Sequence, residues 1–255
     1  MERLLQNKVA LITGTGGGQG RAAALRFAEA GAHVIGCDTK IEGNAETVEL
    51  VTAAGGSMTG MAPVDLGDPA EAAQWVADAV AVHGRMDILY NNASRAEFAP
   101  MGAFPPEQWQ RGIRNELDLL FYATEAAWPH LIESRGVIIN TGSTAGMQGS
   151  GPGGACHAAA KGGVIALSIH WAREGAPFGI RSVCISPGYI ETPGTAAVTA
   201  NKQFHDALVA STLAKRGGTA DDVANLAVYL ASDFASFITG VNYPVDGGSL
   251  IAKIY

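Results

Sequence analysis

Two side chains that can hold or move a proton stand four residues apart in ACHAAAKGG, which spans residues 155–163. The segment is rich in alanine, so it is predicted to be helical, and side chains at positions i and i+4 of a helix share one face. His157 and Lys161 therefore place an imidazole beside an ammonium group. Because two cations would repel, and burial disfavours the charged ring, we expect the imidazole to be neutral at pH 7 and able to accept a proton.

A glycine-rich stretch, GTGGGQG at residues 14–20, could bind an anion. It follows the apolar run KVALITG (8–14) and precedes a segment with the apolar spacing of a helix. Glycines let the backbone approach a ligand, and free N–H groups at a helix start donate to phosphate oxygens. The spacing departs from G-x-G-x-x-G and fits TG-x-x-x-G-x-G, whose fixed positions are Thr13, Gly14, Gly18 and Gly20. This favours a dinucleotide site; a tight turn without a ligand is the alternative.

Asp38 ends the next apolar run, HVIGCD (33–38), 18 residues after Gly20. A carboxylate at this place accepts hydrogen bonds from the ribose 2′- and 3′-hydroxyls and repels a 2′-phosphate. The sequence therefore predicts NAD(H) rather than NADP(H), although the cation Lys40 weakens that preference slightly. The alternative is an aspartate that only forms a turn at the strand end.

Apolar strands alternate with helical segments and would position these groups. Expected strands lie at residues 8–14, 33–38, 58–64, 86–93, 136–142 and 180–188, and expected helices at 19–32, 42–54, 69–83, 106–133, 155–176 and 219–232. The alternation predicts a parallel sheet covered on both faces, the doubly wound α/β architecture, in a single domain over residues 1–255. Residues 193–211 break the alternation as a weak helix and are expected to form a substrate lid; a surface loop without a role is the alternative.

The composition argues against several classes of protein. The chain of 255 residues is 47% hydrophobic and carries a net charge of −7, which disfavours binding to nucleic acid. No run approaches the roughly 18 apolar residues of a membrane span. Cys37, Cys156 and Cys184 form no CxxC pair, and no histidines have the spacing of a metal site. We expect a soluble cytoplasmic protein with reduced cysteines and without a metal.

Five further segments, with the glycine spacing and the His157–Lys161 pair, resemble the short-chain dehydrogenase/reductase family nearly end to end. They are LYNNAS (89–94), GIRNELDLLFYAT (112–124), GVIINTGSTAG (136–146), YIETPG (189–194) and residues 216–248. The resemblance implies a Rossmann-like fold and an NAD-dependent oxidoreductase that acts on a small-molecule secondary alcohol or ketone. It also implies a homo-oligomer, a tetramer or dimer built on the helices at 106–133 and 155–176, and the apolar tail LIAKIY (250–255) could pack across a second interface.

The resemblance further implies the residues of the site. Along the cofactor these are Gly14, Thr15, Gly18, Gln19 and Gly20 at the pyrophosphate, Asp38 at a ribose, Asp65 and Leu66 at the adenine, Asn91 and Ala93 near a ribose, and Pro187, Gly188, Ile190 and Thr192 around the nicotinamide. In the catalytic positions, Ser143 would polarise the substrate oxygen, Lys161 would hold the nicotinamide ribose, and Asn115 would order a water in the proton relay.

The chain departs from the family at the catalytic base, where His157 replaces a tyrosine. Ser94 replaces the glycine of the NNAG motif, and the gap of 14 between Ser143 and His157 is one longer than the commonest spacing. Tyrosine has an ordinary pKa near 10 and histidine one near 6.5. A neutral imidazole suits alcohol oxidation, whereas the imidazolium that carbonyl reduction needs would be disfavoured by its positive neighbours. The shorter ring, which ends roughly 2 Å nearer the backbone, requires a deeper substrate or a bridging water.

Three interpretations of this site stay open. The first is an NAD-dependent dehydrogenase with His157 as the base, which the retained Ser143, Asn115 and Lys161 favour. The second is an NAD(H)-binding protein with little or no redox activity, in a sensing or partner-binding role. The third is non-redox chemistry in the same pocket, or an accidental or engineered loss of the tyrosine. Glu116 and Asp118 are interpreted as ordinary helix-face charges, and Tyr189 is expected to pack against the lid.

Overall fold

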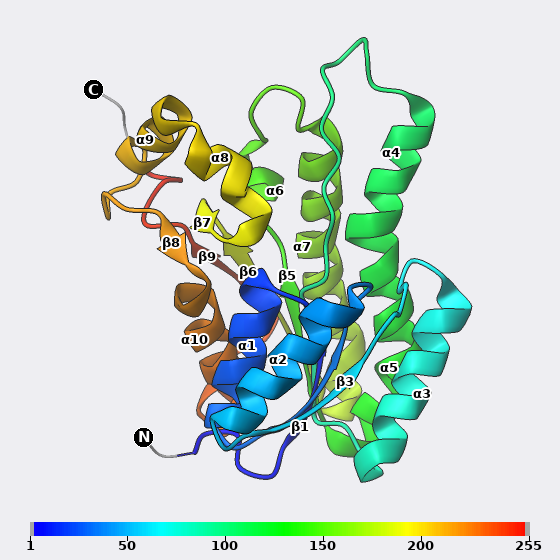
Figure 1. The fold of residues 1–255 in the computed structure, drawn as a ribbon. Coiled ribbons are helices and arrows are strands. Elements are labelled where there is room, and N and C mark those ends of the chain that lie inside the picture. Colours follow the sequence, from blue (N-terminus) through cyan, green and yellow to red (C-terminus); the bar gives the residue numbers. More distant parts are fainter. Residues whose placement is uncertain (1–2, 253–255) are drawn as a thin grey trace.

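Seven parallel strands form the central sheet of the computed structural model, which describes residues 3–252 (Figure 1). In spatial order they are β3 (Ser57–Met61), β2 (His33–Cys37), β1 (Val9–Thr13), β4 (Ile88–Asn91), β5 (Val137–Thr141), β6 (Arg181–Pro187) and β9 (Asn242–Val245). The strand order reverses direction between β1 and β4. In sheets of this kind, ligands bind beside the carboxyl ends of the strands at that point.

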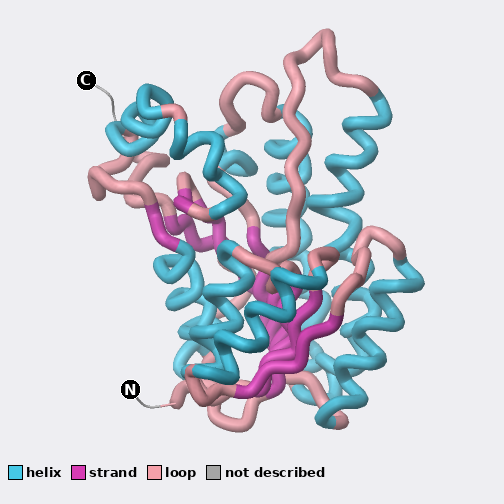
Figure 2. Tube along the Cα trace, viewed as in Figure 1, coloured by secondary structure: helices cyan, strands magenta, loops and turns pink. Residues whose placement is uncertain are grey.

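Helices cover both faces of the sheet, which confirms the predicted doubly wound, single-domain α/β fold (Figure 2). One core lies against α1 (Gly18–Glu29), α2 (Ile41–Ala53) and α10 (Ala220–Ala231), and the other against α3 (Pro69–His83), α5 (Leu119–Ser134) and α7 (Ala155–Gly175). Successive residues of β1 enter opposite cores: Ile12 joins the first and Leu11 the second. Burial on both faces explains why the strands read as continuous apolar runs.

The chemistry of the helix ends explains where α3 begins and stops. The Asp68 side chain accepts hydrogen bonds from the backbone N–H groups of Ala70 and Glu71, and Pro69 occupies the first helical position. Gly84 ends the helix in the left-handed conformation at φ 69°. The predicted start at Asp68-Pro69 is confirmed.

The long helix expected at 106–133 is continuous but changes its winding in the middle. α4 (Pro106–Ile113) passes into a π-helical turn, η1 (Arg114–Asp118), and then into α5, which contains Pro129. Such π-turns are frequent at functional sites. This one carries Asn115, a predicted catalytic residue.

The edge strand β9 was missed in the sequence. Its residues, Asn242-Tyr243-Pro244-Val245, are not an apolar run, and proline has no N–H for a ladder. Pro244 is tolerated because β9 pairs on one side only, with β6. A separate two-stranded sheet joins β7 (Ile190–Glu191) to β8 (Gly218–Thr219).

Residues 193–211, which we call the lid segment, form more structure than the single weak helix expected. They contain η3 (Pro193–Thr195), α8 (Ala196–Ala200) and α9 (Lys202–Ala210), which lie beyond the carboxyl ends of the strands (Figure 1). The Tyr189 hydroxyl is 3.0 Å from Oγ1 of Thr199, so this tyrosine packs against the lid segment as expected. Nε2 of His205 is 3.1 Å from Oε1 of Glu191.

The remaining elements are the short helix α6 (Ala145–Gln148) and the 3₁₀ turns η2 (Ala176–Phe178) and η4 (Asp233–Ala235). All three cysteines are buried and unpaired.

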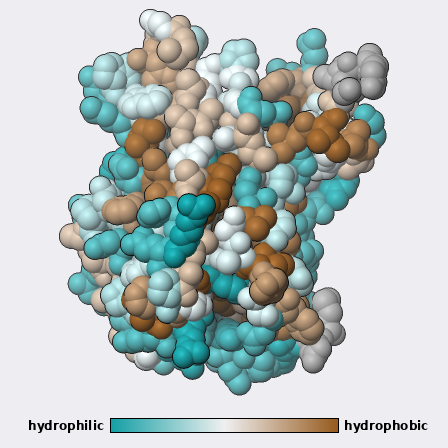
Figure 3. Space-filling model, turned by 180° about the vertical axis from the view of Figure 1, so that it is seen from behind, coloured by the Kyte–Doolittle hydropathy of each residue, from teal (hydrophilic) through white to brown (hydrophobic). Residues whose placement is uncertain are grey.

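Between residues 3 and 252, no helix is long and apolar enough to cross a bilayer. Seen from behind, the surface alternates between polar and hydrophobic residues (Figure 3). Residues 253–255 of the tail LIAKIY lie outside the described part.

Candidate active site

The glycine-rich loop between β1 and α1 is packed tightly on one side and open on the other. A Cβ added to Gly20 would collide with the Gly14 carbonyl oxygen, and one added to Gly14 would lie 2.8 Å from Cα of Ala93. A Cβ on Gly17 would meet nothing within 4 Å. Gly17 directly precedes α1, whose first turn has no side-chain cap, so the helix offers N–H groups to an anion. The loop therefore fits a pyrophosphate.

The two polar side chains of this loop behave differently. Thr15 is fully buried and its hydroxyl donates to Oδ1 of Asn44 at 2.6 Å, so its side chain ties the loop to α2 rather than facing outward. The amide oxygen of Gln19 is buried without a hydrogen-bond partner in the part of the chain that is described. A buried acceptor of this kind needs a donor from a ligand or from solvent.

Asp38 follows β2 and lies against the glycine-rich loop. Its Oδ2 accepts a hydrogen bond from the backbone N–H of Gly16 at 2.7 Å, and its Oδ1 accepts one from the N–H of Lys40 at 2.8 Å. The carboxylate thus occupies the place predicted for a ribose contact, at the rim of the loop.

On the adenine side, the two predicted residues diverge. Asp65 pairs with Arg114 at 2.7 Å, and this hydrogen bond holds the pKa of the Asp65 carboxyl below its ordinary value. The Leu66 side chain is buried in the core beside α3. Only Asp65 presents its side chain at the surface here.

Asn91 supports the strand ends from inside. Its amide donates to Oγ1 of Thr124 and to Oδ1 of Asn140, both at 2.9 Å, and the residue is 2% exposed. These bonds join β4 to β5 and α5. The Asn91 side chain thus lies below the carboxyl ends of the strands. The backbone of Ala93, two residues later, packs against Gly14.

The residues predicted around the nicotinamide gather at the end of β6. Thr192 faces the glycine-rich loop, because a Cβ on Gly18 would lie 3.6 Å from its Cβ. The Pro187 carbonyl accepts a hydrogen bond from the N–H of Thr144 at 3.1 Å, which joins this strand end to the segment after β5. Gly188 packs against Asp246, and Ile190 is buried in the core.

Ser143 is held against the helix that carries the histidine and the lysine. A Cβ on Gly146 would lie 2.6 Å from backbone atoms of Lys161 and Gly162, so α6 can meet α7 only through a glycine. Oγ of Ser143 accepts a hydrogen bond from the N–H of Ala145 at 3.1 Å. Its own proton can therefore be donated to a substrate oxygen.

Lys161 is almost fully enclosed, with 4% of its surface exposed. Its Nζ donates to the Thr141 carbonyl oxygen at 3.0 Å and lies 3.9 Å from Oε1 of Glu116. Burial lowers the pKa of this ammonium group, and the nearby carboxylate opposes the shift.

Glu116 corrects an expectation from the sequence: it is not an ordinary helix-face charge. The side chain is fully buried, and its two oxygens lie 2.8 and 3.0 Å from Nδ1 of His157. Oε1 also accepts a hydrogen bond from the Ser94 hydroxyl at 2.8 Å. Burial would raise the pKa of Glu116, but the hydrogen bond from His157 and the charge of Lys161 outweigh it and lower the pKa.

The sequence did hold a signal for this burial. The buried residues of α5 recur at helical spacing, and Glu116 stands three and four residues before Leu119 and Leu120, so it continues their stripe. The close approach of the two long helices also contributes to the burial of Glu116. A Cβ on Gly112 would collide with Sγ of Cys156, one turn before Glu116 and one residue before His157.

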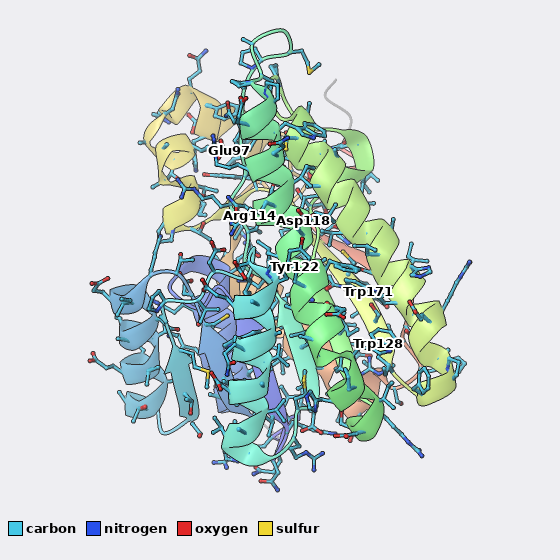
Figure 4. The ribbon with its side chains drawn as sticks, turned by 90° about the vertical axis from the view of Figure 1, so that its right-hand side faces the viewer. Glu97, Arg114, Asp118, Tyr122, Trp128 and Trp171 are labelled. Carbon is cyan, nitrogen blue, oxygen red and sulfur yellow. The ribbon has the colours of Figure 1, made fainter. Side chains whose placement is uncertain are left out.

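Asn115, on the same π-turn, joins different partners. Its carbonyl oxygen accepts a hydrogen bond from the N–H of Arg95 at 3.1 Å, and its side-chain oxygen accepts one from Arg114 at 3.1 Å. It fastens the loop after β4 to the π-turn. Arg114 and Asp118 mark this turn in Figure 4, below Glu97.

The His157 side chain is mostly covered, in part by Phe98. Its ring is 5.8 Å from that of Phe98, between centroids, and 18% of the His157 side chain is exposed. The structure thus brings His157, Lys161 and Glu116 together and joins Ser143 to them through Gly146. No group of three or more potential metal ligands comes together within residues 3–252.

Comparisons with known proteins identify the family and the fold of the chain. A family described as enoyl-(acyl carrier protein) reductase matches residues 14–249. The chain is 35% identical to a 3-oxoacyl-[acyl-carrier-protein] reductase of Thermotoga maritima, over 97% of this chain and 99% of the relative. It is also 35% identical to a cyclohexanol dehydrogenase of an Acinetobacter species, over 97% and 96%. The crystal structure of gox2181 matches with a TM-score of 0.94 at 31% identity and covers 98% of both chains.

Proposed function

Because this chain belongs to the short-chain dehydrogenase/reductase family of oxidoreductases, we propose that it transfers a hydride between NAD(H) and a secondary alcohol or ketone, with His157 as the acid and base. The observation that carries the proposal is the orientation of the His157 ring. Its Nδ1 is bound to Glu116, so Nε2 is the nitrogen left to exchange a proton with a substrate.

Each nearby residue has a defined task in this reaction. The nicotinamide, when bound, supplies the hydride acceptor for oxidation and the hydride donor for reduction. The Ser143 hydroxyl donates a hydrogen bond to the substrate oxygen and fixes the orientation of the substrate. Nε2 of His157 accepts the hydroxyl proton of the alcohol and passes it to solvent, which reaches the ring at its exposed part.

The buried carboxylate changes an expectation about direction. From the sequence, only positive neighbours surround His157, and carbonyl reduction should be poor. Both Glu116 oxygens are in hydrogen-bond contact with Nδ1 of the ring, and Nζ of Lys161 lies 3.9 Å from one of these oxygens. The Glu116 carboxylate can accept the hydrogen bond from Nδ1 whether or not Nε2 carries a proton. We therefore propose that the site can both take up and return the proton.

One observation favours NAD(H) over NADP(H). The Asp38 carboxylate stands at the rim of the glycine-rich loop, where it would repel a 2′-phosphate. The open space at Gly17 suits the pyrophosphate that both dinucleotides carry. These residues, together with Lys161, would hold the dinucleotide.

The test is a coupled measurement of binding and turnover. Purified protein is titrated with NADH and NADPH by fluorescence, and reduction of NAD⁺ is followed with a panel of secondary alcohols that includes cyclohexanol, the substrate named for one relative. We expect turnover with NAD⁺, and His157→Phe should lower kcat by about 10²–10⁴-fold without weakening NADH binding. Tight NADH binding without turnover across the panel would instead support a cofactor-binding protein without redox activity.

A further inference from the structure

We infer that Glu116 is a positioning residue that selects which nitrogen of His157 reacts, and that Ser94 assists it. The inference rests on the proposed function for its catalytic meaning. Its structural content, the location of one proton on the His157 ring, can be tested without any substrate.

The geometry at Nδ1 determines the tautomer. Both oxygens of Glu116 face this nitrogen, at 2.8 and 3.0 Å. An ionised carboxylate can only accept hydrogen bonds, so the proton of the neutral ring must be on Nδ1. The lone pair is then on Nε2, the nitrogen that is not bound to Glu116. Without this partner, the ring could carry its proton on Nε2, where it would block the base.

The surroundings hold the carboxylate in place. The Glu116 side chain is fully buried, so water does not compete for its oxygens. The Ser94 hydroxyl donates to Oε1 at 2.8 Å, and the Lys161 ammonium lies 3.9 Å from the same oxygen. The other ionisable neighbours are the buried Cys156 thiol on α7 and Glu97 on the preceding loop, which pairs with Arg111 at 3.1 Å. Lys161 therefore supplies the positive charge beside the carboxylate while the His157 ring is neutral.

The proton balance leaves Glu116 ionised throughout. In oxidation with NAD⁺ as the hydride acceptor, the O–H bond of the alcohol breaks and an Nε2–H bond forms, which gives an imidazolium with protons on both nitrogens. Its Nδ1–H continues to donate to Glu116. The Nε2 proton then leaves to solvent and the starting tautomer returns. No proton moves to the carboxylate.

The first experiment measures the tautomer directly. Protein labelled with ¹⁵N in its histidines is examined by long-range ¹H–¹⁵N NMR above pH 8, with no ligand present, and His157 is assigned by comparison with His157→Phe. We expect the Nδ1–H form in the native protein. In Glu116→Gln the amide can accept from or donate to Nδ1, so we expect the Nε2–H form to appear. A native ring with its proton on Nε2 would overturn the inference.

The second experiment measures turnover in the same variants. Glu116→Gln should lower kcat for alcohol oxidation by about 10²-fold or more, as expected when a catalytic histidine loses its orienting carboxylate, while KM for NAD⁺ and the Kd for NADH stay within about twofold. Ser94→Ala should lower kcat by about 3–10-fold.

A matched control separates position from charge. Asp118→Asn removes a carboxylate from the same π-turn without touching His157, and should leave the tautomer and kcat unchanged. If Glu116→Gln and Asp118→Asn lower kcat equally, a specific role for Glu116 is wrong. If the native tautomer is Nδ1–H but no alcohol is oxidised, the proposed function fails while the assignment of Glu116 as the partner of Nδ1 stands.

Discussion

Lys161 places an ammonium group inside the protein. Two neighbouring groups stabilise this buried charge. The ammonium donates to the Thr141 carbonyl and lies 3.9 Å from Glu116. Burying a charge is unfavourable unless it is paired and hydrogen-bonded, and removing one partner leaves the other uncompensated. The lysine and the glutamate should therefore be coupled in stability as well as in catalysis.

This coupling gives a quantitative prediction. Lys161→Met should lower the free energy of unfolding by about 1–3 kcal/mol, because it strands the Glu116 carboxylate and the Thr141 oxygen. In the double variant Lys161→Met/Glu116→Gln, the loss should be smaller than the sum of the two single losses. Urea denaturation of the four proteins at pH 7 measures the coupling. Strictly additive losses would mean that the two charges do not interact.

At the scale of residues, the spacing of residues in the sequence predicted part of the candidate site but did not indicate Glu116. The i,i+4 pair and Ser143 could be read from the chain because their positions follow one helix and one strand end. Glu116 was misjudged because a carboxylate is seldom buried, and its partners His157 and Ser94 lie 41 and 22 residues away along the chain. The side chains of Thr15, Leu66 and Asn91 are buried, so their expected contact with the cofactor stays a prediction for their backbone groups.

At the scale of elements, the loop between β1 and α1 contains glycines with two different roles: Gly20 is required by packing, and Gly17 leaves space for a ligand. Gly20→Ala should destabilise the fold by several kcal/mol, because its Cβ would collide with the Gly14 carbonyl. Gly17→Ala meets no neighbour within 4 Å and should change stability by less than about 1 kcal/mol. It should still weaken NADH binding by about 10-fold or more, since the methyl group would project where the pyrophosphate is expected. Thermal denaturation and NADH titration of both variants test this; unchanged affinity in Gly17→Ala would place the cofactor elsewhere.

The lid segment should respond to pH through His205. Hydrogen bonds from the His205 ring to the carboxylates of Asp206 and Glu191 raise the pKa of this imidazole above its ordinary value, and Tyr189 packs on its ring. A raised pKa means that the charged pair is complete below about pH 6.5 and is lost as the pH rises through the higher value of the folded state. Lys202, which pairs with Asp206, stays charged across this range.

We therefore expect hydrogen exchange in residues 196–210 to be faster at pH 8.5 than at pH 6, after correction for the intrinsic rate. His205→Gln should remove the difference. Lys202→Gln, on the same helix and without contact to Glu191, serves as the control and should keep it. Equal protection at both pH values in the native protein would show that His205 does not hold the lid segment.

The order of the elements could be predicted because strands buried on both faces leave apolar runs in the sequence. β9 could not, since its stability comes from pairing with β6 and not from its own residues. The lid segment was expected as one weak helix for a related reason: its helices are short, and contacts from Tyr189 and Glu191 outside them hold them in place.

Over the whole molecule, two groups stand out among the large apolar side chains that are exposed on residues 3–252. The first is Phe121 on α5 with Ile169 on α7, the two long helices that also carry Trp128 and Trp171 (Figure 4). The second is Phe234 in η4 with Phe237, which lies two residues after η4 and is completely exposed. Burying such groups against another copy of the chain is favourable. This agrees with the homo-oligomer that the family resemblance implies.

The expected outcome is a homo-oligomer. Light scattering should give at least twice the chain mass of 26.3 kDa. Phe121→Glu and Phe237→Glu should each lower the assembly state, because a charge would be buried at an apolar contact. Val82→Glu, at an exposed position on α3, is the control. A native protein that sediments as a monomer would contradict the prediction.

The contact between Gly112 and Cys156 also sets a steric limit on the two long helices. A side chain at position 112 would collide with Sγ of Cys156 and push the helices apart, which would carry positions 116 and 157 away from each other. The contact between the carboxylate and the imidazole therefore depends on a glycine that touches neither group.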